Sequence, residues 1–396
     1  MVVKKMLALG QNNSTIRQIA EFGRQRRAQI GAENVFDFSI GNPNVPAPPE
    51  VTEAFQSLIA HTPATELHAY TAAPGDHSVR QAVADNVFAT FGYRAKADYI
   101  YMTAGASASL AISLSAVAQI GDEVIVFTPY FPEYRVFIEN TGAKFVAVDC
   151  AEGNFQFRRE TLEAAINART RAVIVNSPNN PTGVVFTEES IRALASVLTA
   201  KSAQYGHPIY LIADEPYREL VYDGKQVPYI PHFYPNTIVC YSFSKSLSLP
   251  GERIGYILQA TEAQDGGDLF DAICGAGRAL GYICAPSLLQ QLVKRCLGMT
   301  ADISIYDRNR KLLYEALTDY GYEAVYPDGA FYLFVKALEP DANAFCEKAK
   351  ALDLLFVPAD SFGCEGYVRI AYCVTTEQIQ RSLPRFRQLK ALYEGD

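Results

Sequence analysis

One repeated pattern constrains the fold more than any other feature: short apolar runs that end in turn residues alternate with amphipathic helical stretches. Helical periodicity is clear in Ser107–Ile120 and Ser190–Ala200. Several of the apolar runs are uninterrupted, which is typical of strands buried on both faces. The predicted strands are Tyr99–Met102, Val124–Phe127, Lys144–Val148, Ala172–Val175, Tyr210–Ala213 and Ile238–Tyr241, with Arg253–Leu258 as a further candidate. The alternation predicts an α/β fold with a mostly parallel, seven-stranded sheet covered by helices on both sides.

Both ends of the chain depart from this pattern. Near the N-terminus, Ser14 is a candidate cap for a helix that ends before Val35, and Phe36–Ile40 is a short predicted strand. The proline-rich stretch Pro43–Pro49 then favours a crossing between domains. Beyond residue 300 the pattern predicts one long helix and several short strands, which are Ile303–Tyr320 for the helix and Phe331–Val335, Leu354–Val357 and Val368–Cys373 for the strands.

A chain of 396 residues is too long for one ordinary hydrophobic core. We therefore predict a large domain over residues 46–298 and a smaller α+β domain built from residues 1–45 and 299–396. The N-terminal helix is expected to pack on the smaller domain.

The composition excludes several classes of protein. With 49% hydrophobic and 20% charged residues, the chain is neither disordered nor membrane-like. The formal net charge of −8 argues against binding nucleic acid or an anionic membrane through the overall field. The eight cysteines include no C-x-x-C pair, no secretory signal is visible, and no metal site is indicated. We therefore expect a cytoplasmic protein whose partners are small molecules.

Polar residues gather where the predicted strands end, which is where open parallel sheets bind their ligands. The first strand runs into Gly105, Ala106 and Ser107 at the start of a helix, where free backbone amides favour an anion such as phosphate. A tight strand–helix turn would look the same. Two later strands end in Asn179-Asn180-Pro181-Thr182-Gly183 and in Asp214-Glu215-Pro216-Tyr217. A carboxylate such as Asp214 is costly to bury without a cationic partner, although it could also be a helix cap.

The last of these strands ends in Ser242-Phe243-Ser244-Lys245, and Arg253 follows eight residues after the lysine. Lysine normally lies on solvated faces, so a lysine in a hydroxyl-rich turn is unusual. Desolvation and nearby cations lower the pKa of a lysine and make it nucleophilic toward an aldehyde. The serine hydroxyls and Arg253 suit a phosphate group. Each feature alone has a structural explanation, but their joint occurrence at successive strand ends indicates an active site.

Taken together, these motifs resemble the class I/II aminotransferases, the aspartate aminotransferase family of fold-type I enzymes that depend on pyridoxal 5′-phosphate (PLP). The resemblance extends from Ile40-Gly41-Asn42-Pro43 to Arg369. It implies that Lys245 holds PLP as a Schiff base and then moves the proton between the substrate Cα and the cofactor. It also implies that Asp214 pairs with the pyridine N–H, so that the ring can act as an electron sink.

Further roles follow from the same resemblance. Asn180 and Tyr217 correspond to the groups that hydrogen-bond the phenolic oxygen of the cofactor, and Phe131 to the aromatic residue that stacks on its ring. The phosphate group would be bound by Gly105, Ala106, Ser107, Ser242 and Arg253. Tyr70 corresponds to a tyrosine that reaches the phosphate from a neighbouring subunit, which implies a homodimer with shared active sites.

For the substrate, Arg369 corresponds to the arginine that grips the α-carboxylate through its planar guanidinium. Gly41 lets the backbone approach the same carboxylate, and Asn180 is expected to contact the substrate as well. Arg278 is a candidate for the second arginine that reads a distal carboxylate in dicarboxylate-specific members, but a surface or interface arginine is an equally good interpretation. The family analogy makes 2-oxoglutarate the expected amino-group acceptor.

Three other functions fit parts of the same pattern. A PLP-dependent carbon–sulfur β-lyase would use the same lysine, aspartate and phosphate-binding residues. A sensor of PLP or amino acids would carry an additional DNA-binding domain, for which the chain leaves little room before the scaffold begins. A non-catalytic homologue is disfavoured because the expected set of functional residues is complete.

Overall fold

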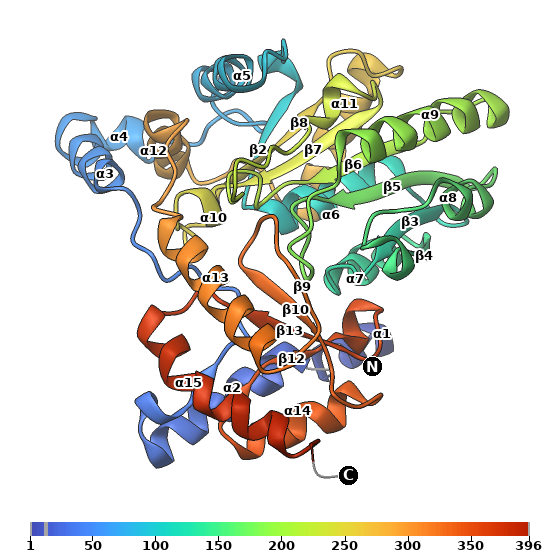
Figure 1. Ribbon diagram of the computed structural model, residues 1–396. Coiled ribbons are helices and arrows are strands. Elements are labelled where there is room, and N and C mark those ends of the chain that lie inside the picture. The colour runs from blue at the N-terminus through green and yellow to red at the C-terminus, as the bar shows by residue number, and fades with distance from the viewer. Residues whose placement is uncertain (1, 12–14, 395–396) are drawn as a thin grey trace.

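The computed structural model describes residues 2–11 and 15–394, and it is built around one seven-stranded sheet (Figure 1). Five strands run parallel to one another in the order β7-β6-β5-β3-β4, β8 pairs antiparallel to β7, and β2 pairs antiparallel to β8. The strands are β2 (Ile100–Thr103), β3 (Glu123–Thr128), β4 (Lys144–Asp149), β5 (Thr170–Asn176), β6 (Tyr210–Asp214), β7 (Thr237–Ser242) and β8 (Gly255–Gln259). The predicted α/β fold with a mostly parallel sheet is therefore confirmed.

Helices cover both faces of this sheet, and the alternation of strand side chains explains why. In β3, Val124 and Val126 pack into the core on one face, whereas Ile125 and Phe127 pack into the core on the other. The first core contains residues of α6 (Ala106–Val117), α7 (Glu133–Asn140) and α11 (Gly266–Leu280). The second contains residues of α3 (Pro49–His61), α5 (His77–Phe91), α8 (Arg159–Ala165), α9 (Glu188–Tyr205) and α12 (Ser287–Cys296).

Local signals set the ends of these helices. The Thr187 hydroxyl accepts a hydrogen bond from the Ser190 backbone N–H at 3.1 Å and caps the start of α9. The helix ends at Tyr205, and the next residue, Gly206, caps it with φ +73°, the left-handed conformation that glycine tolerates best. The short helices are α4 (Ala64–Leu67) and α10 (Phe243–Ser246).

A second structural unit lies below the large sheet in Figure 1. Its core combines the two ends of the chain with Tyr217, Leu220 and Tyr222. Its four-stranded antiparallel sheet has the order β12-β13-β10-β9, and β1 pairs parallel with β11 beside it. The strands are β1 (Phe36–Asp37), β9 (Ala324–Val325), β10 (Tyr332–Lys336), β11 (Leu354–Leu355), β12 (Val357–Pro358) and β13 (Tyr367–Ala371). The helices are α2 (Thr15–Ile30), α13 (Ser304–Asp319), α14 (Ala342–Ala351) and α15 (Thr376–Ala391). Helix α1 (Lys4–Gln11) has no buried residues, and its Lys5 Nζ donates to the Glu139 carbonyl at 2.7 Å, in α7.

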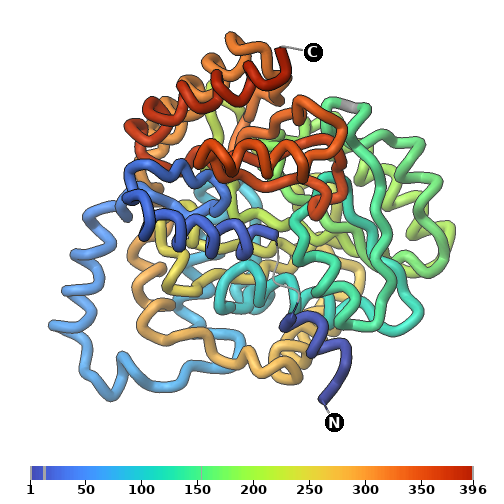
Figure 2. The backbone as a smooth tube through the Cα atoms, turned by 90° about the horizontal axis from the view of Figure 1, so that it is seen from below, coloured from blue at the N-terminus to red at the C-terminus, as the bar shows by residue number. Residues whose placement is uncertain are grey.

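The N-terminal helix α2 packs on this second unit, as expected: Ile16 and Ile19 contact the cluster that contains Val357 and Phe362. Figure 2 shows α2 beside the C-terminal segments drawn in red. The proposed cap Ser14 lies outside the described residues. Within the described ranges, no helix is both long enough and apolar enough to span a membrane.

Three strand predictions needed correction. The predicted strand Phe36–Ile40 ends at Asp37, because the Asp37 carboxylate accepts the Ser39 backbone N–H at 2.9 Å and turns the chain. The segment Leu354–Val357 divides between β11 and β12, which pair with different partners. The candidate strand at Arg253 begins only at Gly255, since Arg253 has φ +53°, which an extended strand excludes.

Candidate active site

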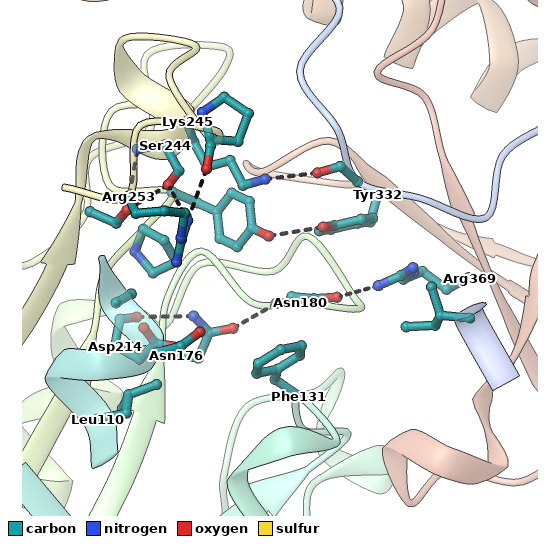
Figure 3. Close-up of a pocket in the computed structure, with 18 residues that line it drawn as sticks. Leu110, Phe131, Asn176, Asn180, Asp214, Ser244, Lys245, Arg253, Tyr332 and Arg369 are labelled. Atoms are coloured by element: carbon teal, nitrogen blue, oxygen red, sulfur yellow. Dashed lines mark hydrogen bonds between the residues drawn. The ribbon is translucent and has the colours of Figure 1, made fainter. Parts of the chain in front are cut away.

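A cavity of about 280 Å³ lies at the carboxyl ends of β5, β6 and β7, between the large sheet and the second unit (Figure 3). The start of α6, helix α2 and strands β10 and β13 also contribute to its walls. The described side chains that line it include three cations, Lys245, Arg253 and Arg369, and one carboxylate, Asp214. The cavity is therefore suited to a ligand that carries negative charge at more than one point.

Lys245 enters this cavity from α10, immediately after β7. Its Nζ donates a hydrogen bond to the Gly41 carbonyl at 2.7 Å and lies 5.2 Å from the centre of the Phe331 ring. Burial lowers the pKa of Lys245 from an ordinary 10.5 to about 8, although the neighbouring Cys373 thiol acts in the opposite direction. Near neutral pH the amine is therefore more often unprotonated, and more nucleophilic, than an ordinary lysine.

Asp214 ends β6 and is almost completely buried. One carboxylate oxygen, Oδ2, accepts a hydrogen bond from the Tyr134 hydroxyl, while Oδ1 is buried without a hydrogen-bond partner among the described residues. Burial raises the pKa of Asp214 to about 7, despite the opposing effect of the Tyr134 hydrogen bond. A buried oxygen without a partner is costly, so Oδ1 is suited to accept a hydrogen bond from a cationic N–H of a ligand.

One end of the cavity has the features of an anion site. Residues Ala106 and Ser107 lie in the first turn of α6, where backbone N–H groups and the helix dipole favour negative charge. A side chain on Gly105, which has φ +88°, would come within 2.7 Å of Arg253 Nη2. The Ser242 and Ser244 hydroxyls hydrogen-bond each other at 2.7 Å, and Arg253 Nη1 lies 3.4 Å from Ser244 Oγ. Hydroxyls, amides and a guanidinium thus converge as a phosphate would require.

Another wall of the cavity presents Arg369, which enters from β13 with only 2% of its surface exposed. Its Nη1 donates to Asn180 Oδ1 at 3.1 Å and its Nη2 to the Ser39 carbonyl at 2.6 Å; Figure 3 shows the contact with Asn180. The Nε atom is buried without a partner among the described residues. A guanidinium that is fixed by two groups and retains an unpaired N–H can bind a carboxylate.

Most residues that the sequence singled out lie together. Those that line the cavity are Gly41, Ala106, Ser107, Phe131, Asn180, Asp214, Tyr217, Ser242, Lys245, Arg253 and Arg369. Gly105 does not line the cavity itself but lies against the Arg253 guanidinium. Two residues lie outside the cavity: Tyr70, which is 94% exposed, and Arg278, which is exposed in the last turn of α11.

The sequence analysis did not assign roles to several residues at this site. Asn176 could have been found from the sequence, because it directly follows the predicted strand Ala172–Val175. In the structure it is in register with Asp214 and donates to the Asp214 carbonyl at 2.9 Å. Tyr332 gave no signal, since it lies within the apolar run Phe331–Val335, and Tyr134, which stands between Glu133 and Arg135, belongs to none of the predicted strand-end motifs. Ile16 of α2 also lines the cavity, and only tertiary packing brings this N-terminal residue to the site.

Comparisons with known proteins agree with this geometry. Residues 33–386 match the model of the family described as aminotransferase class I and II. The chain is 31% identical over 361 residues to a probable aspartate/prephenate aminotransferase of Thermus aquaticus, covering 88% of this chain and 89% of the relative. It is 32% identical over 376 residues to a (5-formylfuran-3-yl)methyl phosphate transaminase of Methanocaldococcus jannaschii, covering 92% and 93%.

Solved structures give the same result. A crystal structure of an aminotransferase from Eubacterium rectale superposes with a TM-score of 0.97 at 52% identity, covering 100% of this chain and 99% of the other. Aspartate aminotransferase from Thermus thermophilus with maleate superposes with a TM-score of 0.86 at 26% identity, covering 98% and 99%. This chain is therefore an aminotransferase, and it belongs to the class I and II family, whose fold-type I members depend on PLP.

Proposed function

We propose that this enzyme moves the α-amino group of an L-amino acid to a 2-oxo acid, with Lys245 as the Schiff-base lysine and proton carrier. One observation carries the proposal: an amine with a lowered pKa, a buried carboxylate with a free oxygen and a buried arginine with a free N–H all face one cavity. PLP requires such an amine at its aldehyde carbon and such a carboxylate at its ring nitrogen, and an amino acid bound to PLP requires such an arginine at its carboxylate.

The residues present fit the cofactor. When bound, PLP supplies an aldehyde that takes up the amino group and an electron-poor ring that stabilises negative charge at the substrate Cα. Asp214 would hold the pyridine N–H through its free Oδ1, and Phe131 would pack against the ring. Ser242, Arg253 and the start of α6, with Gly105, Ala106 and Ser107, would bind the phosphate. Tyr217, together with Asn180, would donate hydrogen bonds to the phenolic oxygen.

The chain's own groups would also orient the substrate and move the proton. Arg369 would bind the α-carboxylate through Nε, and Asn180 would keep the guanidinium in place. Gly41 would let the backbone approach the same carboxylate, and a side chain there would overlap the Tyr332 hydroxyl. Lys245 would take the proton from the substrate Cα and return it during each half-reaction.

We propose 2-oxoglutarate as the acceptor. Two relatives support a dicarboxylate: one is named a probable aspartate/prephenate aminotransferase, and the Thermus thermophilus structure was solved with maleate. Arg278 does not line the cavity of its own chain, so it would act on a distal carboxylate only from a second subunit.

We further propose a cytoplasmic homodimer with shared active sites. Tyr70 is 94% exposed and Arg253 is exposed within one chain, as expected if a second subunit covers the phosphate end of the site. We also propose the division into a large domain of residues 46–298 and a small domain of residues 1–45 and 299–396. The separate sheets of these regions support that division, and Tyr217, Leu220 and Tyr222 of the large region pack into the core of the small one.

The visible absorption spectrum of the purified protein tests the central proposal. A cofactor band that converts to the amine form with one amino acid, and returns when 2-oxoglutarate is added, would support transamination with that acceptor. Formation of pyruvate from cystathionine or cysteine without an oxo acid would instead favour the β-lyase. A protein that shows no band even after PLP is added would contradict the role of Lys245.

The lowered pKa of Lys245 predicts how fast cofactor-free protein takes up PLP at different pH values. The protonated amine cannot attack an aldehyde, so the rate should rise with pH around a midpoint near 8 and level off above it. Stopped-flow absorbance at a series of pH values would measure this midpoint. A midpoint above 10 would mean that Lys245 behaves as an ordinary solvated lysine.

Asp214→Asn should weaken PLP binding. The amide keeps the shape of the side chain but removes the charge that pairs with the pyridine N–H, and a hydrogen bond to a charged group contributes about 1.5–3 kcal/mol. We expect PLP to dissociate about ten- to one-hundredfold more readily, as measured by equilibrium dialysis. Asp149→Asn is the matched control, because Asp149 also ends a strand of the large sheet but lies outside the cavity. Equal PLP affinities in the two variants would contradict the role of Asp214.

A further inference from the structure

Tyr332 contacts more parts of the proposed machinery than its apolar sequence context indicates. It is the first residue of β10, lines the cavity, and is only 2% exposed. Its hydroxyl lies 2.8 Å from the Tyr217 hydroxyl. The Arg369 guanidinium carbon lies 4.6 Å from the centre of its ring. One side chain therefore touches both the proposed cofactor ligand and the proposed carboxylate ligand.

The backbone fixes Tyr332 in this position from two directions. In the sheet, Phe334 is paired with Arg369, so Tyr332 and Arg369 are diagonal neighbours across β10 and β13. In the preceding loop, the Ala330 N–H donates to the Leu220 carbonyl at 2.8 Å, and the Tyr222 hydroxyl donates to the Ala330 carbonyl at 2.5 Å. Tyr332 is thereby tied to the same loop that carries Tyr217.

The number of protons available decides which of the two hydroxyls donates to the other. A tyrosine hydroxyl has one proton to donate. If Tyr217 gives its proton to the phenolic oxygen of PLP, its own oxygen must accept from Tyr332. Burial raises the pKa of Tyr332 to about 12, so its hydroxyl keeps a proton to donate near neutral pH. A chain of two donors polarises and strengthens the second hydrogen bond.

The ring of Tyr332 has a separate effect. A guanidinium over an aromatic face is attracted by the ring, and the attraction is stronger when both groups are desolvated, as Tyr332 and Arg369 are. We propose that Tyr332 is a positioning residue for transamination: its hydroxyl orients Tyr217 as a donor, and its ring holds the Arg369 guanidinium for the substrate carboxylate. This inference rests on the proposed function of the site.

Two variants separate these roles. Tyr332→Phe removes only the hydroxyl, and Tyr332→Leu removes the ring as well. Tyr372→Phe is the matched control, because Tyr372 is another buried tyrosine whose hydroxyl bonds the Ala330 carbonyl, at 3.2 Å, without lining the cavity. Two properties of each holoenzyme are measured besides activity. One is the pH midpoint at which the visible band changes, and the other is the Kd for maleate and for 3-phenylpropionate, which are carboxylates without an amino group.

In Tyr332→Phe, we expect the spectral midpoint to rise by about 0.5 to 1 pH unit, because a weaker donor at the phenolic oxygen favours the protonated form. Its Kd for the carboxylates should stay within about twofold of wild type. In Tyr332→Leu, we expect the same midpoint shift, and the Kd for the carboxylates should rise roughly five- to thirtyfold. Tyr372→Phe should change neither property.

The outcomes also distinguish this inference from the proposed function. An unchanged midpoint in Tyr332→Phe, with the wild-type band present, would overturn the role of the hydroxyl and leave the proposed function intact. Wild-type carboxylate affinity in Tyr332→Leu would overturn the role of the ring. PLP titration of each variant gives its folded fraction, so unfolding would not be mistaken for loss of carboxylate binding. Absence of a PLP band in the wild-type protein would overturn both proposals.

Discussion

Lys245→Ala should abolish measurable transamination while leaving the fold intact. Loss of the positioned proton carrier alone should lower kcat/KM by roughly 10²- to 10⁴-fold, and loss of covalent attachment adds to that effect. The side chain is partly buried and makes one hydrogen bond, from Nζ to the Gly41 carbonyl, so its removal should have little effect on stability. Steady-state kinetics with an amino acid and 2-oxoglutarate would measure the loss.

Two further variants make this test specific. Lys336 is an exposed lysine of β10 whose Nζ lies 2.9 Å from Glu323 Oε2. Lys336→Ala should leave activity unchanged. Lys245→Arg keeps a positive charge but provides neither an amine for the Schiff base nor a group that readily releases a proton, so it should be as inactive as Lys245→Ala. Full activity in Lys245→Ala would show that another residue attaches the cofactor.

Arg369→Ala should have the second large effect, and its kinetic signature should differ. Both the amino acid and the oxo acid carry the carboxylate that Arg369 is proposed to bind, so the KM for each should rise. Truncating one partner of a buried, hydrogen-bonded charge pair costs about 2–5 kcal/mol, which corresponds to roughly a 30- to 5,000-fold loss in kcat/KM. The visible PLP band should remain, because Arg369 is not among the groups proposed to hold the cofactor.

Arg369→Lys would show whether charge alone is sufficient. Lysine keeps the charge but lacks the planar fork that binds a carboxylate with two hydrogen bonds, so most of the activity should still be lost. Arg385→Ala is the control, since Arg385 is an exposed arginine on α15. If Arg369→Ala raised the KM for only one of the two substrates, the arginine would be recognising something other than the shared carboxylate.

Sequence reasoning could predict the location of the site because of a general property of parallel sheets. Alternating apolar runs specify the strands, and the carboxyl ends of parallel strands meet at one edge. Asn180, Asp214 and Lys245 each follow the end of a predicted strand, and they do face one cavity. The resemblance to a known family added Arg369 and Gly41, which lie on elements whose relation to the large sheet no periodicity reveals.

The predicted strand boundaries failed where side chains or backbone angles override the apolar pattern. Asp37 ends β1 early by binding the Ser39 backbone. The positive φ of Arg253 delays the start of β8 until Gly255. Such local contacts are invisible in a pattern of apolar and polar residues, because they depend on which way one side chain turns.

The sequence by itself therefore determined the class of fold, the edge of the sheet that carries the site, and most of the polar residues found there. Only the tertiary structure decided how those residues are paired. Tyr134 occupies one oxygen of Asp214 and leaves the other free, and Tyr332 connects Tyr217 to Arg369. The physical reason is that local periodicity specifies where the strands and helices lie along the chain, whereas these contacts join residues 80 and 115 positions apart, or residues on different strands, and exist only once the elements have packed.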